Sequence, residues 1–78
     1  MNVIPVWKLK DNLTNILKEY KDENDIVDIS DIRKFILELY RSNNLWLNEA
    51  FQTYLYYASC KKIDITVRDL KDFIEKVR

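Results

Sequence analysis

The chain of 78 residues contains no glycine and no histidine, and it has only one proline and one cysteine. Without glycine, tight turns that require a positive φ depend on asparagine or aspartate. This composition argues against a fold rich in β-hairpins and favours helices joined by short polar loops. We therefore expect a single all-α domain over residues 1–78.

The single cysteine and the missing histidine exclude several kinds of site. Cys60 has no second cysteine with which to form an intrachain disulfide, and a catalytic Cys–His pair needs a histidine. A calcium loop built on Asp22, Asn24 and Asp28 would also require a glycine and a terminal glutamate, which that acidic segment lacks. We expect no metal, no cofactor and no catalytic activity, and we interpret Cys60 as a packing residue.

The balance of charge restricts the partners of the chain. Thirteen basic and thirteen acidic residues cancel, whereas strong nonspecific binding of nucleic acid requires an excess of lysine and arginine. Any contact with DNA is therefore expected to be local or shared with a partner. The sequence also lacks a signal peptide and an apolar stretch of about 20 residues that could span a membrane, so we expect a soluble, unprocessed intracellular protein.

The two ends of the chain show clear helical patterns. Apolar residues at spacings of three and four predict a first helix over about residues 5–21, with Pro5 in its first turn. An acidic loop follows, and Asp28 or Ser30 is able to cap the next helix. Thr66 and Asp69 resemble a capping box, which predicts a last helix of about 12 residues that reaches the C-terminus. The apolar stripes of these two helices consist of Val6, Leu9, Leu13, Ile16, Leu17 and Tyr20, and of Val67, Leu70, Phe73, Ile74 and Val77.

The middle of the chain allows two interpretations. The apolar stripe that begins at Ile32 keeps its helical phase as far as Tyr57, which favours one helix of about 30 residues. Ser42, Asn43 and Asn44 favour a break instead, because Asn44 is a fair N-cap and asparagine has mediocre helix propensity. We favour the single helix, and the alternative is a compact four-helix domain with a break near Ser42–Asn44.

The segment LWLNEAFQTYLYYASC, residues 45–60, is apolar on nearly every side of a helix. A helix of this kind must be buried on more than one side, and the outer helices have stripes that are wide enough to cover only one of its faces. The segment therefore predicts either a partner chain or, as the alternative, a central position in a four-helix monomer. The partner interface expected from it consists of Trp46, Leu47, Ala50, Phe51, Tyr54, Leu55 and Tyr57.

Two further patterns carry a resemblance to a known family. LWLNEAF, residues 45–51, looks like the middle of the central helix of a histone fold, and KIDITVRDLKDFIEKV, residues 62–77, resembles its second loop and last helix. Within the histone-fold family, the small size and near-neutral charge are similar to the centromere protein X family. The resemblance implies a nuclear, obligate histone-fold heterodimer, with a second small all-α chain, that binds DNA and serves kinetochore assembly and DNA repair.

The basic residues Lys61, Lys62 and Arg68 flank the second loop. In a histone-fold pair this loop lies beside the first loop of the partner, so these residues are candidates for shared contacts with DNA phosphates. An equally weighted alternative is a solvated helix end that interacts favourably with the helix dipole.

Two functions therefore remain open. The first is a non-enzymatic histone-fold subunit that acts by heterodimerisation, or as a homodimer, and shares its DNA contacts with its partner. The alternative is a self-folding four-helix protein-interaction module, of viral or regulatory type, that has no role on DNA.

Overall fold

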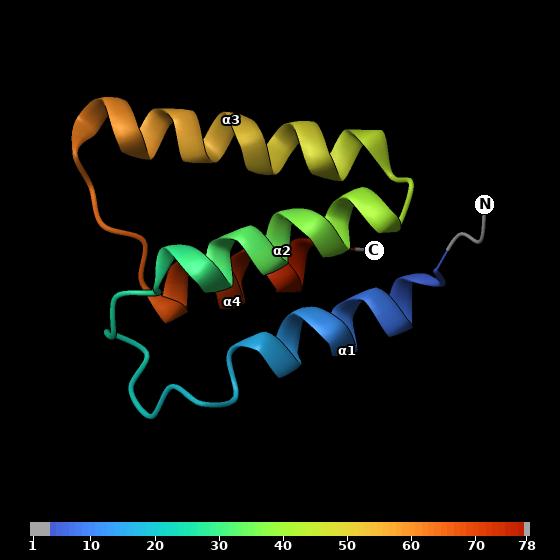
Figure 1. Cartoon of the computed structure of the whole chain (residues 1–78), viewed down its shortest axis with the longest axis horizontal. Coiled ribbons are helices and arrows are strands. Elements are labelled where there is room, and N and C mark those ends of the chain that lie inside the picture. Colours follow the sequence, from blue (N-terminus) through green and yellow to red (C-terminus); the bar gives the residue numbers. More distant parts are fainter. Residues whose placement is uncertain (1–3, 78) are drawn as a thin grey trace.

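A computed structural model of the chain describes residues 4–77. Within this range the protein consists of four helices: α1 (Val6–Ile16), α2 (Ile29–Arg41), α3 (Leu45–Lys61) and α4 (Val67–Lys76). The helices α1 and α3 lie at opposite sides of the molecule, with α2 and α4 between them (Figure 1). The radius of gyration of 12.0 Å is close to the value of about 11.5 Å expected for a folded domain of this length. The prediction of an all-α fold is confirmed.

Helix α1 is shorter than its apolar pattern predicts. It ends at Ile16, and the prediction of a helix to about residue 21 is wrong. Leu17 and Tyr20 still face the core, but they reach it from a turn in which the Tyr20 N–H donates to the carbonyl of Leu17. The Tyr20 hydroxyl donates to Asp31 Oδ2 over 2.6 Å and accepts from the Asp28 N–H over 2.9 Å. These bonds fasten the turn to the start of α2.

The predicted single central helix is wrong, because the chain breaks at Ser42–Asn44 and forms the alternative four-helix arrangement. The Ser42 hydroxyl is buried and donates to the carbonyl of Leu39 over 2.6 Å. Asn43 has a φ of 56°, and asparagine accepts this left-handed conformation more readily than most residues. The Asn44 side chain then accepts a hydrogen bond from the Leu47 N–H over 3.2 Å and caps α3. Each residue of the Ser-Asn-Asn sequence thus contributes to the break.

The end of α3 and the start of α4 are fixed by local hydrogen bonds. Lys62, with a φ of 55°, ends α3 in a Schellman motif, in which the Ile63 N–H donates to Ala58 and the Lys62 N–H donates to Ser59. Thr66 and Asp69 exchange the two reciprocal bonds of a capping box at the start of α4. The predicted cap is therefore confirmed.

The two long loops of the chain pair with each other. Ile26 and Thr66 form an isolated antiparallel bridge. The Val27 N–H donates to the carbonyl of Ile65 over 2.8 Å, and the Val67 N–H donates to the carbonyl of Asp25 over 2.9 Å. These bonds hold the acidic loop of residues 17–28 against the connection between α3 and α4.

A single hydrophobic core joins the four helices. Its centre is aromatic: the ring of Phe51 lies 5.4 Å from that of Phe35 on α2 and 5.1 Å from that of Phe73 on α4. The fully buried large side chains are Phe35, Phe51, Leu9, Leu13, Leu39, Leu70, Val67 and Val77.

Candidate functional site

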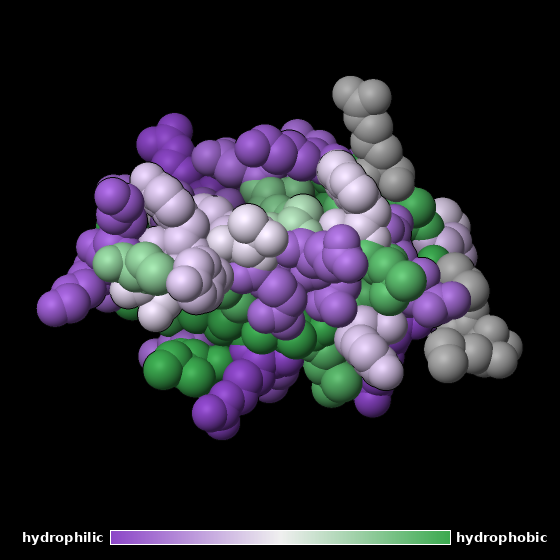
Figure 2. Space-filling view, turned by 90° about the horizontal axis from the view of Figure 1, so that it is seen from above, coloured by the Kyte–Doolittle hydropathy of each residue, from purple (hydrophilic) through white to green (hydrophobic). Residues whose placement is uncertain are grey.

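Helix α3 covers the core with one side and leaves large apolar side chains on the others. Trp46 is 71% exposed and Tyr56 is 73% exposed, and Leu45 and Tyr57 are exposed as well. Figure 2, which views the molecule from the side of α3, shows hydrophobic and near-neutral side chains scattered between hydrophilic ones across this face. The described part of the chain therefore does not enclose α3 on all sides.

The structure divides the predicted partner interface into three groups. Leu47 and Phe51 are buried in the core of the chain itself. Leu55 is half-buried on the side of α3 that faces the start of α2. The third group consists of Trp46, Ala50 and Tyr54, which lie on the side of α3 toward α4, and of Tyr57, which is exposed beside Lys61.

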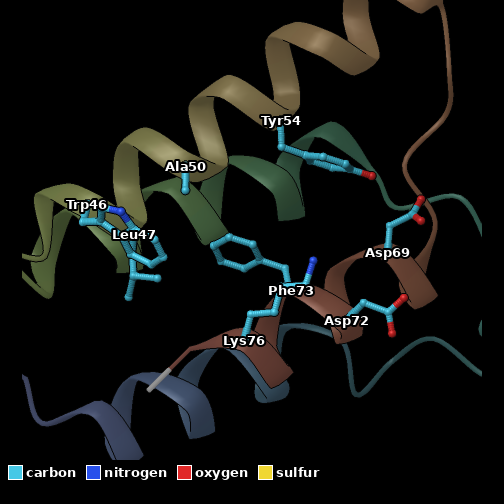
Figure 3. Close-up of a pocket in the computed structure, with 8 residues that line it drawn as sticks. All are labelled: Trp46, Leu47, Ala50, Tyr54, Asp69, Asp72, Phe73 and Lys76. Carbon is cyan, nitrogen blue, oxygen red and sulfur yellow. The ribbon is translucent and has the colours of Figure 1, made fainter.

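A groove opens between α3 and α4. Its volume is about 390 Å³. On the α3 side, Trp46, Ala50 and Tyr54 follow one another at intervals of four residues, which places them on one face of the helix. On the α4 side, the ring of Phe73 projects between the helices below Ala50 (Figure 3). The eight lining residues are Trp46, Leu47, Ala50, Tyr54, Asp69, Asp72, Phe73 and Lys76.

Charged residues of α4 form the rim of the groove. Asp69 is engaged in the capping box with Thr66, whereas Asp72 forms no ion pair among the described residues. Burial raises the pKa of the Tyr54 hydroxyl, and the neighbouring Asp69 carboxylate raises it further. Tyr54 is therefore a neutral hydrogen-bonding group at neutral pH, and the rim presents two carboxylates followed by Lys76 along α4.

Sequence reasoning missed Phe73 and Asp72 as parts of a site. Phe73 belongs to the apolar stripe of the last helix, and this pattern by itself predicts a core residue. It does touch the core, because its ring contacts that of Phe51, but it is only partly buried. The spacing from Asp69 to Phe73 was the available signal, since it places an acid and an aromatic residue on one face of the helix.

The predicted DNA-binding residues lie at the two ends of the connection between α3 and α4. Lys61, Lys62 and Arg68 are all exposed, and the Lys61 ammonium lies 5.9 Å from the centre of the Tyr57 ring. The Arg68 N–H donates to the carbonyl of Glu23 in the acidic loop. The loop pairing thus places carboxylates near the start of α4, where the Glu23 side chain also pairs with Lys71 at 3.5 Å. The surface around the three basic residues is of mixed charge.

Other kinds of site find no support in residues 4–77. Within this range no three acidic or cysteine side chains are grouped so that they could hold a metal ion. None of the described helices has both the length and the hydrophobicity that a membrane crossing requires. Cys60 is exposed, so its interpretation as a packing residue is wrong.

Comparisons with known proteins add no relative to these observations. No family model, no curated protein and no solved structure matches the chain.

Proposed function

We propose that the protein is a non-enzymatic protein-binding module, and that the groove between α3 and α4 receives an amphipathic helix of a partner. The observation that carries the proposal is the 390 Å³ groove itself, which is floored by aromatic and aliphatic side chains and bordered by an exposed tryptophan. An amphipathic helix that lays its apolar face into a hydrophobic groove is a recurrent mode of protein recognition. Tryptophan and tyrosine are also the residues most enriched among those that dominate binding energy.

The size of the groove fits side chains of a partner helix. One large aliphatic or aromatic side chain that is transferred from water into an apolar site contributes about 1.5–3 kcal/mol. The space between Trp46, Ala50 and Phe73 is bordered by α3 on one side and by α4 on the other. Ala50 has the smallest side chain of this stripe, so a partner helix is able to approach α3 most closely at that point.

The charges on the rim favour one direction of the partner helix. Asp69 and Asp72 precede Lys76 along α4. A partner that places a basic residue opposite Asp72 and an acidic residue opposite Lys76 forms two favourable pairs, whereas the reversed helix meets like charges. Rim charges of this kind mainly set orientation and the rate of association.

We do not extend the proposal to DNA. The exposed basic residues Lys61, Lys62 and Arg68 share their surface with the acidic loop, and the chain has no net charge. A histone-type pair would also require a continuous central helix, and α2 ends at Arg41. The protein proposed here binds a partner chain, as the sequence predicts, and corresponds more closely to the four-helix interaction module than to a histone-fold subunit.

The test begins with capture of the partner in an extract of the source cells. A photo-reactive amino acid at Ala50, inside the groove, should cross-link a specific protein, and the same group at the exposed residue Gln52, outside the groove lining, serves as the control. The cross-linked protein is then purified, and its affinity for the isolated chain is measured by calorimetry.

The decisive comparison uses two equally exposed aromatic residues. Trp46→Ala should weaken the binding of the purified partner by about 30-fold, a loss of about 2 kcal/mol that is typical of an interface hot spot. Tyr56→Ala removes a similarly exposed ring that does not line the groove and should change the affinity less than threefold, which is about 0.7 kcal/mol. Equal losses in the two variants, or a loss only in Tyr56→Ala, would refute the groove as the binding site.

A further inference from the structure

A second groove lies on a different part of the molecule, between the start of α2, the second half of α3 and the two paired loops. Its volume is about 500 Å³. Its lining is rich in isoleucine and shares no residue with the groove between α3 and α4. The residues of this isoleucine groove are Ile26, Val27, Asp28, Ile29, Ile32, Leu55, Ala58, Ser59, Ile63, Asp64 and Ile65.

Three isoleucines that line this groove expose large apolar side chains to solvent. Ile26, Ile29 and Ile63 are each more than half exposed and surround a single hollow, whereas Val27 and Ala58 in the same lining are buried. A contiguous apolar patch with a polar rim marks an interaction site more often than isolated surface residues do. Because β-branched side chains have few rotamers, these residues lose little entropy when a ligand covers them.

The backbone around the isoleucine groove is already fixed. The Val27 N–H donates to the carbonyl of Ile65, and the Ile63 N–H donates to the carbonyl of Ala58 over 2.9 Å. The first bond ties one loop to the other, and the second belongs to the Schellman motif that ends α3. A ligand therefore meets a formed site and does not have to order two loops on binding.

The charged residues in the lining of the isoleucine groove are both acidic. Asp28 and Asp64 are the charged members of its lining, both are exposed, and neither forms an ion pair among the described residues. The Asp28 side chain makes no capping bond to α2, so its carboxylate remains available. The nearby end of α3 adds the negative pole of a helix dipole. Two basic residues lie close by but are not part of this lining: Lys61, which lies over the ring of Tyr57, and Lys62, which is exposed beside Ile63.

We propose that the isoleucine groove is a second protein-docking site, and that its occupant is a segment of another protein with aliphatic side chains flanked by lysine or arginine. The aliphatic side chains cover the three exposed isoleucines, and the basic residues pair with the two carboxylates. Charge complementarity distinguishes this ligand from that of the groove between α3 and α4, whose rim carries both signs. The inference stands independently of the proposed function, because the two grooves have separate linings.

The test is an NMR titration of the full ¹⁵N-labelled chain with two short synthetic peptides. One is an amphipathic peptide of leucine and lysine, and the other has glutamate in place of each lysine. The cationic peptide should shift the amide resonances of Ile26, Ile29 and Ile63 saturably, and the anionic peptide should leave them in place. Two variants connect the shifts to the groove. Ile63→Ser should lower the affinity for the cationic peptide about tenfold, because it removes one apolar contact. Asp64→Asn should lower this affinity about threefold.

A matched control separates this site from general attraction to an acidic surface. Asp11→Asn removes one exposed negative charge from α1, outside the lining of both grooves, and should leave the affinity for the cationic peptide unchanged. Equal weakening by Asp64→Asn and Asp11→Asn would show general attraction to an acidic surface and would overturn the proposal. Saturable shifts confined to the groove between α3 and α4 would also overturn it. A shift of the isoleucine-groove resonances with protein concentration, before any peptide is added, would also overturn the proposal. A second copy of the chain would then be the occupant.

Discussion

Phe51 is the side chain whose replacement best distinguishes the folded core from a partner interface. The sequence assigns it to the expected interface, whereas the structure buries it completely, at 0% exposure, between Phe35 and Phe73. If Phe51 belongs to the core, Phe51→Ala destabilises the isolated chain. If it belongs to an interface, the same change affects mainly the association with a partner.

The expected loss is large relative to the stability of the chain. Replacement of a buried phenylalanine by alanine costs about 3–5 kcal/mol, through lost transfer free energy and the cavity that remains. Two aromatic neighbours with ring centroids 5.4 Å and 5.1 Å away favour the upper half of that range, since such pairs add about 0.5–1.5 kcal/mol each. A domain of 78 residues has a free energy of unfolding of roughly 4–12 kcal/mol. Phe51→Ala therefore removes a third or more of the stability.

Urea denaturation of the purified chain, followed by circular dichroism, measures this loss. With a slope of about 1 kcal/mol per molar urea for a small protein, a loss of about 4–5 kcal/mol should lower the midpoint by about 4–5 M. Trp46→Ala is the control, because Trp46 is 71% exposed and a surface substitution usually changes the free energy of unfolding by less than about 0.5 kcal/mol. If the free energy of unfolding of Phe51→Ala lies within about 1 kcal/mol of the wild-type value, the burial of Phe51 is refuted, and with it the packing of α3 on α2 and α4.

The remaining predictions concern the connections between the helices and are checked by urea denaturation. Lys62→Gly should raise the free energy of unfolding by about 0.5–1 kcal/mol, because glycine accepts the φ of 55° without a steric cost; Asn43→Ala should lower it by about 1 kcal/mol, because alanine disfavours the φ of 56°. Thr66→Ala should lower it by about 1 kcal/mol through loss of the capping box, and Thr66→Ser should be close to neutral. Burial, and to a smaller extent the hydrogen bond to Asp31, raises the pKa of the Tyr20 hydroxyl. The protonated hydroxyl therefore stabilises the folded chain below about pH 10, and this contribution is lost as the pH rises through the raised pKa. Above about pH 10 the stability of the wild type should therefore fall more steeply with pH than that of Tyr20→Phe.

Local sequence predicted the features that depend on neighbouring residues. The capping box of Thr66 and Asp69 is one example, because both of its bonds lie within four consecutive residues. The absence of glycine also predicted that asparagine or aspartate would occupy a turn with positive φ, and Asn43 does so. Lys62 in the same conformation was not predictable from residue type, since it is imposed by the Schellman motif that leads the chain toward the acidic loop.

The apolar pattern was a poorer guide to where helices end. The pattern indicates which side chains are buried, and it continues unchanged where a turn, rather than a helix, places a side chain in the same core. Leu17 and Tyr20 extend the pattern of α1 in this way after the helix has stopped at Ile16. The apolar stripe likewise continues across the break at Asn43, because α2 and α3 pack against each other and contribute to one core.

The sequence by itself determined that the protein is all-α, that α4 begins at a capped threonine, and that α3 carries more apolar side chains than one face can hold. Only the tertiary structure decided which of those side chains are covered. Phe51 is buried because Phe35 of α2 and Phe73 of α4 pack against its side of α3, whereas Trp46 and Tyr57, at other positions around the helix, remain exposed. The spacing of residues along one helix gives the direction of each side chain, but whether a neighbour lies in that direction depends on the path of the rest of the chain.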